Sequence, residues 1–179
     1  MRKFLFFIAM TITVVSYGQK YISEKTFISF YSHAAIEDIK AENTKASSVF
    51  DAATGNIAFS VPIKDFEFAK TLMQEHFNEK YLETEKFPKS TFEGKIVGFD
   101  ASKKGPQSVK AQGKIILHGV TRNLDIPGTL EVQGNRIRMK SVFVAKLVDY
   151  NIMRPEIMFQ KIAEQVDVTV DFTFKPYEK

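Results

Sequence analysis

The stretch QVDVTVDFTF, Gln165–Phe174, alternates between polar and apolar side chains at every position. Alternation with a period of two is typical of a β-strand that buries one face and exposes the other. The same pattern recurs through most of the chain. The sequence therefore predicts an all-β protein.

Similar alternation marks further strands, strong in some stretches and weaker in others. The strong stretches are residues 57–63, 109–117, 124–132 and 137–147, and the weaker ones are residues 26–32, 36–50 and 90–99. Short turn signals, such as Gly105-Pro106 and Gly134-Asn135, separate neighbouring stretches. About eight antiparallel strands joined by short turns favour a closed up-and-down barrel, with a β-sandwich as the alternative. Small inward residues such as Gly113 and Gly128 suit the curvature of a barrel.

One stretch breaks the strand pattern. Apolar residues and one histidine recur there at helical spacing: Ala69, Leu72, Met73, His76, Phe77 and Tyr81. Polar residues occupy the opposite side, and Pro88 ends any helix that follows. The pattern predicts one short amphipathic helix over residues 69–82 with its apolar stripe turned toward the barrel.

The N-terminus has the layout of a secretory signal peptide. Arg2 and Lys3 precede an apolar run from Phe4 to Val15, and small residues lie before Gln19. We expect residues 1–18 to be a signal peptide cleaved near Gly18, and residues 19–179 to form one domain in the periplasm or outside the cell. An uncleaved anchor is the alternative, although the apolar run is short for a membrane span.

Composition and charge exclude several classes of function. The 179-residue chain has no cysteine, which rules out thiol catalysis and thiolate metal sites. Its net charge of +4 is not gathered into a basic stripe interleaved with aromatic residues, so no nucleic-acid partner is expected. The three histidines, His33, His76 and His118, share no metal-ligand spacing. No catalytic motif is present, and we expect neither a metal nor a cofactor.

The interior of such a barrel can be filled by its side chains or can hold one ligand. A packed core and a lumen look alike in sequence, so both interpretations stand. The residues between 148 and 159 favour a pocket, because they place Tyr150, Ile152, Met153, Met158 and Phe159 where a structural turn would be shorter and more polar. The predicted ligand-binding side chains are Phe59, Val61, Ile63, Leu72, Met73, His76, Phe77, Phe92, Leu117, Leu130, Met139, Phe143, Tyr150, Val168, Val170 and Phe172.

Several motifs resemble those of the YceI-like, polyisoprenoid-binding proteins of bacterial envelopes. The motifs are Met73-x-x-His76-Phe77, Tyr81-Leu82-x-x-x-Lys86-Phe87-Pro88-x-x-x-Phe92, the run Gly113–Thr121, Asp149-Tyr150-x-Ile152 and the strand Val166–Phe174. Their order spans nearly the whole chain after residue 20. The departure from better-known members lies in residues 34–41.

The resemblance implies a lipocalin-like, eight-stranded antiparallel up-and-down barrel with one short inserted α-helix. It also implies an exported, non-catalytic protein that holds a long isoprenoid or fatty chain in the barrel, for carriage, storage or an envelope stress response. Transient contact with a membrane follows from an insoluble ligand, and the oligomeric state, a homodimer included, is left open. Alternatives are an enzyme that uses His76 or His118 on an apolar substrate, a transmembrane barrel and a barrel with a filled core.

Overall fold

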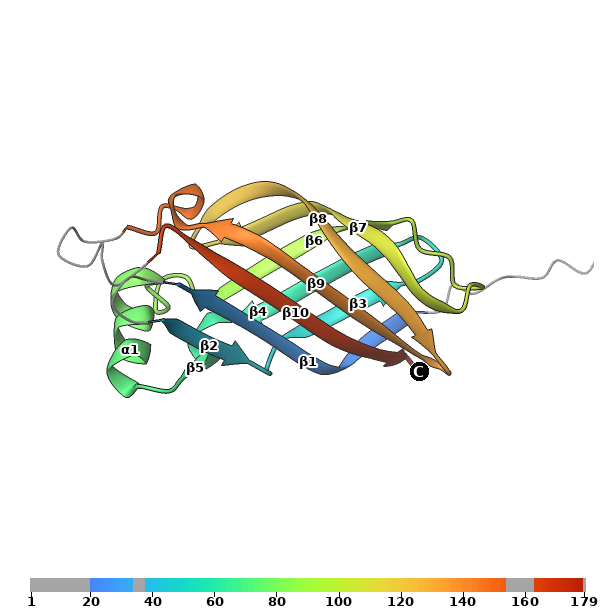
Figure 1. The fold of residues 1–179 in the computed structure, drawn as a ribbon, viewed down its shortest axis with the longest axis horizontal. Coiled ribbons are helices and arrows are strands. Elements are labelled where there is room, and N and C mark those ends of the chain that lie inside the picture. Colours follow the sequence, from blue (N-terminus) through green and yellow to red (C-terminus); the bar gives the residue numbers. More distant parts are fainter. Residues whose placement is uncertain (1–19, 34–37, 154–162, 179) are drawn as a thin grey trace, which may run out of the picture.

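The computed structural model describes residues 20–33, 38–153 and 163–178, so the expected signal peptide lies outside the described residues. Ten strands form one antiparallel sheet that closes on itself because β1 pairs with β10. Eight strands make the barrel: β1 (Lys20–Ser32), β3 (Ser47–Asp51), β4 (Asn56–Pro62), β6 (Lys89–Val97), β7 (Gly105–Leu117), β8 (Val120–Gln133), β9 (Arg136–Lys146) and β10 (Gln165–Pro176). Figure 1 shows the strands winding obliquely around the long axis. The predicted lipocalin-like barrel is confirmed.

Strand β1 changes partner along its length. Its first residues pair with β3, as in Tyr21 with Phe50, and its last residues pair with β2 (Ile39–Asn43), as in Phe30 with Ala41. The two-residue strand β5 (Glu67–Phe68) then pairs with β2. Strands β2 and β5 thus extend the wall at one end of the barrel.

The single strand expected over residues 36–50 is two strands, β2 and β3, within the described part of that range. The chain turns after Asn43, whose side chain is 1% exposed. Its Oδ1 accepts a hydrogen bond from the backbone N–H of Lys45 at 2.8 Å, and its Nδ2 donates to the carbonyl of Pro62 at 2.8 Å. The first of these hydrogen bonds closes an Asx-type turn, which reverses the direction of the backbone without glycine or proline.

The inserted helix is present and lies across one end of the barrel (Figure 1). It consists of α1 (Thr71–His76) followed directly by the π-helical turn η2 (Phe77–Tyr81), so it begins at Thr71 instead of Ala69. The short 3₁₀ turn η1 (Ile63–Asp65) and β5 lead into it. Among the described residues, no helix is both long and apolar enough to cross a membrane.

The opposite end of the barrel is packed with aromatic side chains. The ring of Phe50 lies 6.0 Å from that of Phe174, and the ring of Phe172 meets that of Phe59 edge-on at 5.3 Å. Phe172 and Phe174 are 0% exposed. We call this group, Phe50, Phe59, Phe172 and Phe174, the aromatic floor, because it closes the interior at this level.

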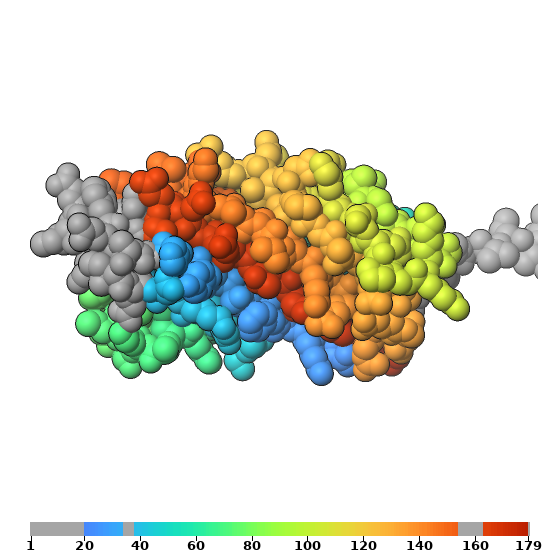
Figure 2. All heavy atoms as spheres, viewed as in Figure 1, coloured from blue at the N-terminus to red at the C-terminus, as the bar shows by residue number. Residues whose placement is uncertain are grey.

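The outer face of the barrel carries polar and charged side chains between the strands. Arg138 on β9 makes two hydrogen bonds to Asp171 on β10, at 3.0 and 2.7 Å. Neighbouring strands β1, β9 and β10 form a continuous wall on the face shown in Figure 2. On this face the paired strands separate the interior from the surface.

Candidate binding cavity

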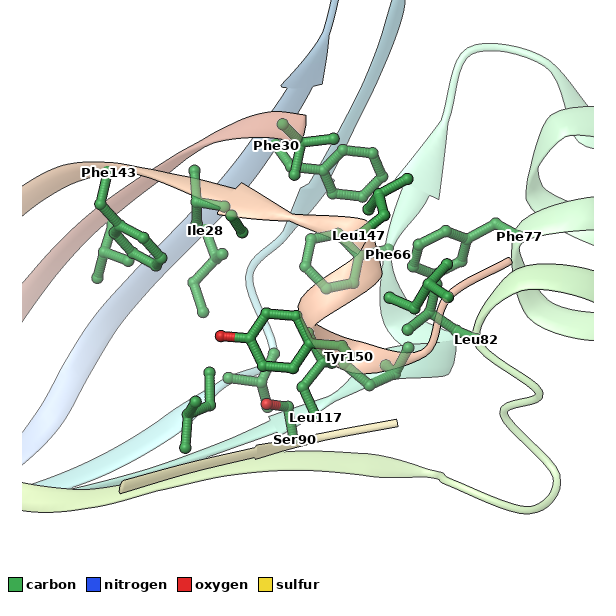
Figure 3. Close-up of a pocket in the computed structure, with 18 of the residues that line it drawn as sticks. Ile28, Phe30, Phe66, Phe77, Leu82, Ser90, Leu117, Phe143, Leu147 and Tyr150 are labelled. Atoms are coloured by element: carbon green, nitrogen blue, oxygen red, sulfur yellow. The ribbon is translucent and has the colours of Figure 1, made fainter. Parts of the chain in front are cut away.

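A cavity of about 490 Å³ occupies the barrel between the aromatic floor and the helix. This volume lies within the range of small-molecule sites, about 300–1,000 Å³. Apolar side chains from the barrel strands, α1, η2 and the 3₁₀ helix η3 (Leu147–Tyr150) line it. Figure 3 shows Ile28, Phe143 and Leu147 converging on this space from different elements.

The structure places nearly all the predicted binding residues on this cavity. Those that line it are Phe59, Val61, Ile63, Leu72, Met73, His76, Phe77, Phe92, Leu117, Met139, Phe143, Tyr150, Val168, Val170 and Phe172. Leu130 is the exception: it is 0% exposed and is not part of the lining. It lies opposite Met139 on β9 and is completely covered by other side chains, so it belongs to the core.

Sequence reasoning missed part of the lining. Ile28 and Phe30 come from the inward face of β1, and their spacing of two residues in a strand was a usable signal. Phe66 and Phe68 lie in and beside the two-residue strand β5, which is too short to show a period. Ile152 was expected near the mouth and does line the cavity, whereas Met158 and Phe159 lie outside the described residues.

Four phenylalanines attach the helical segment to the barrel end. The ring of Phe77 stacks on Phe30 at 5.5 Å and lies 5.7 Å from Phe66 and 5.0 Å from Phe68. Aromatic pairs at these distances stabilise a packing arrangement beyond the area that they bury. Next to this cluster, Leu72 lines the cavity and is also 61% exposed. The cavity therefore reaches the surface beside α1, and we call this opening the mouth.

The few hydroxyl groups along the lining differ in their hydrogen bonding. Ser90 Oγ donates to the carbonyl of Ile116 at 2.9 Å, and Ser141 Oγ donates to the carbonyl of Pro127 at 2.7 Å. Tyr150 is 4% exposed, and burial, together with the charge of Asp149, raises the pKa of its phenol. The phenol is thus held in its neutral, proton-donating form. No charged side chain occurs among the described lining residues.

A largely buried histidine joins three elements at the helix end of the barrel. His118, in the β7–β8 turn, places Nδ1 3.0 Å from the carbonyl oxygen of Tyr150 and Nε2 2.9 Å from Oε2 of Glu83. Its side chain is 9% exposed, and the ring of Phe87 packs against it at 4.7 Å. The backbone angle φ is positive at both His118 (+50°) and Glu83 (+43°), a conformation that is unfavourable for residues other than glycine. The contact between them therefore fixes the turn after the helix to the rest of the mouth.

Neither of the two histidines considered as catalytic bases combines a position on the cavity lining with a carboxylate partner among the described residues. His76 lines the cavity, but no carboxylate pairs with it among the described residues. His118 has a carboxylate partner but is not part of the lining. No group of three or more His, Asp or Glu side chains in the described ranges could hold a metal ion. The arrangement offers a container for an apolar molecule.

The fold and the cavity define a lipocalin-like barrel with an apolar lumen. The YceI-like domain family matches residues 20–174, and the chain belongs to this family. The comparison with curated protein sequences gave no match.

Solved structures share the fold at low sequence identity. A polyisoprenoid binding domain from Saccharophagus degradans, implicated in plant cell wall breakdown, has a TM-score of 0.76 and 15% identity, over 88% of this chain and 98% of its own. BcnA of Burkholderia cenocepacia has a TM-score of 0.70 and 17% identity, over 83% and 95% of the two chains. The YCEI protein of Campylobacter jejuni has a TM-score of 0.64 and 13% identity, over 100% of both.

Proposed function

We propose that this protein is an exported, non-catalytic binding protein that holds the chain of a long apolar lipid, of isoprenoid or fatty type, in its lumen. The observation that carries the proposal is the cavity between the mouth and the aromatic floor, whose described lining is almost entirely apolar. The structural likeness to a polyisoprenoid binding domain supports the ligand class.

The energetics of such a site need no strong polar anchor. Each buried methylene contributes about 0.8 kcal/mol, so a chain that places about ten carbons in the lumen gains about 8 kcal/mol before the cost of ordering it. Bulky side chains such as Met73, Met139 and Phe143 form adaptable walls for a flexible chain. Affinity therefore scales with the length of chain that fits above the aromatic floor.

Native mass spectrometry of the protein purified from its own envelope, followed by organic extraction, tests the proposal. The wild type is expected to carry the added mass of a long-chain lipid. Ala145→Trp, which puts a large side chain into the cavity, should remove that mass. Val144→Trp is the matched control, since Val144 is the next residue on β9, faces outward and is 51% exposed.

The outcomes separate the alternatives. Loss of lipid in Ala145→Trp alone supports capture in the lumen. Equal lipid in both variants would show that the lipid binds elsewhere. A wild type without added mass and without extractable lipid would favour a barrel that has no such ligand.

Loading from a membrane is part of the proposal, because the ligand is insoluble in water. Three exposed apolar side chains lie on α1 and on the segment that follows β9: Leu72 at 61%, Val148 at 74% and Met153 at 80% exposure. Such residues are expected to insert into a lipid interface. Replacing Leu72 and Val148 by Ser should reduce co-sedimentation with lipid vesicles, whereas replacing the outward Val97, at the far end of β6, should not.

Export is proposed from the N-terminal pattern of residues 1–18. N-terminal sequencing of the protein from fractionated cells should give a chain that starts near Gln19 in the periplasmic or secreted fraction. A chain that retains Met1 in the membrane fraction would instead indicate an uncleaved anchor.

A further inference from the structure

The hydroxyl of Tyr150 has no hydrogen-bond partner among the described residues, although the residue is 4% exposed and lines the cavity. A hydroxyl without a partner in an apolar site is unfavourable. The buried serine hydroxyls on the lining are both partnered: that of Ser90 donates to a backbone carbonyl, and that of Ser32 accepts from the backbone N–H of Ala163. Tyr150 is thus a largely buried residue whose hydroxyl borders an apolar cavity without a hydrogen-bond partner among the described residues.

The structure fixes the position of this phenol ring. Tyr150 ends the 3₁₀ helix η3, and its backbone carbonyl accepts the hydrogen bond from Nδ1 of His118 at 3.0 Å. The next turn is closed by a hydrogen bond from the N–H of Ile152 to the carbonyl of Leu147 at 3.1 Å. In Figure 3 the hydroxyl points into the cavity, on the side of the ring away from Phe77 and Leu82. A ring anchored in this way is pre-organised to donate one hydrogen bond inside the lumen.

We infer that the lipid in the lumen carries one neutral acceptor oxygen, such as a carbonyl or an ether oxygen, which accepts a hydrogen bond from the hydroxyl of Tyr150. This inference rests on the proposed function and names its ligand more narrowly. Burial keeps the phenol protonated, so it serves as the donor. A carboxylate or phosphate is disfavoured at this place, because no Lys or Arg side chain occurs in the described lining to balance a buried negative charge.

The inference separates two roles in recognition. The apolar walls supply affinity for any chain of suitable length, whereas Tyr150 discriminates between chains that differ by a single oxygen. A plain alkane leaves the hydroxyl without a partner. A chain with a suitably placed oxygen satisfies it and is held at one depth in the barrel.

Displacement of a fluorescent apolar probe by a long-chain dialkyl ketone, and by the alkane of the same length, tests the inference. The wild type is expected to bind the ketone about tenfold more tightly than the alkane. Tyr150→Phe keeps the ring and removes the hydroxyl, so the ketone-to-alkane ratio should fall to about one while alkane affinity is kept or increased. Tyr177→Phe makes the same chemical change at a position that is 53% exposed and outside the cavity lining, and it should leave the ratio near the wild-type value.

The readout distinguishes failure of this inference from failure of the proposed function. If the wild type and Tyr150→Phe both bind the ketone and the alkane with equal affinity, the lumen binds apolar chains but Tyr150 does not recognise an oxygen atom. The inference about Tyr150 is then wrong. The same holds if the ratio survives in Tyr150→Phe. If neither chain displaces the probe from the wild type, the lipid-binding proposal fails and this inference fails with it. Thermal unfolding of each variant shows that the comparison is made between folded proteins.

Discussion

Nε2 of His118 lies 2.9 Å from a carboxylate oxygen of Glu83, while Nδ1 of the same ring lies 3.0 Å from the backbone carbonyl of Tyr150. Both partners are acceptors, so both hydrogen bonds form together when each ring nitrogen carries a proton or when Glu83 is protonated. A hydrogen bond to a charged group is stronger than a neutral one. The pair therefore joins the turn after the helix to η3 at the mouth.

Glu83→Ala should lower the free energy of unfolding by about 1–2 kcal/mol, because a nearly buried ring nitrogen loses its partner. Glu83→Gln should recover much of this loss, since its amide nitrogen can donate to an unprotonated Nε2. Urea unfolding measures both changes. Glu85→Ala is the control: Glu85 is 91% exposed in its pair with Lys64, and its loss should cost less than about 0.5 kcal/mol. Equal effects at the two positions would contradict a structural role for the His118 contact.

Acid stability should depend on the pair of Arg138 and Asp171. The hydrogen bonds from Arg138 lower the pKa of the Asp171 carboxyl below its usual value. A lowered folded-state pKa stabilises the protein above the unfolded value, about 3.9, and this stabilisation is lost as the pH falls through the folded value. Asp171→Asn should thus reduce stability at neutral pH and flatten its decline below about pH 4. Urea unfolding from pH 7 to pH 2 tests this expectation. Arg138→Gln should likewise make the free energy of unfolding fall less steeply below about pH 4.

Phe172→Ala should open the aromatic floor. Phe172 is 0% exposed and meets the ring of Phe59 at 5.3 Å, so its truncation should cost about 3–5 kcal/mol in the lipid-free protein. The new space is continuous with the cavity that Phe172 lines. The variant is expected to favour longer chains than the wild type and to regain stability when they bind. An unchanged chain-length profile would show that the floor does not limit the ligand.

Gly113→Ala should disrupt the pairing of β6 with β7. A β-carbon on Gly113 would lie 2.2 Å from the carbonyl oxygen of Glu93 and 2.5 Å from Cα of Gly94, and both are backbone atoms that cannot rotate away. We expect a loss of at least about 2 kcal/mol of stability. Lys114→Ala, at the exposed next position, should change stability by less than about 0.5 kcal/mol. Thermal and urea unfolding compare the two variants.

Val170→Arg should abolish ligand capture or folding, because it puts an unpaired charge into the apolar lumen. Thr169→Arg, the neighbouring outward position on β10, should retain both. Lipid extraction and circular dichroism test the two variants. A folded Val170→Arg protein that still co-purifies with lipid would show that the lumen is not the binding place.

The alternation of the strands predicted which side chains face inward, since successive residues point to opposite faces and one face must be buried. Val170 and Phe143 lie as that pattern predicts. It could not show that Leu130 belongs to the core whereas Phe143 lines the cavity, because both side chains point inward. Whether a given level of the barrel is filled depends on large side chains from strands far away in sequence, here Phe50 and Phe174.

The mouth was only partly predictable for the same reason. Tyr150 was expected near it because the segment after β9 is unusually apolar for a turn. The contact between His118 and Glu83 joins residues 35 apart in the sequence, and no local pattern indicates it. The break in residues 36–50 did have a signal, since Asn43 favours a turn.

The tilted and edge-on rings of the aromatic floor close the interior of this barrel on one side, as the bottom closes a test tube. If the proposed lipid enters and leaves through the mouth, whatever delivers it and whatever collects it would have to visit the α1 end in turn. A chain longer than the tube would leave its remainder outside, within reach of the next carrier. Handover would then begin from the protruding part, without the barrel having to unfold.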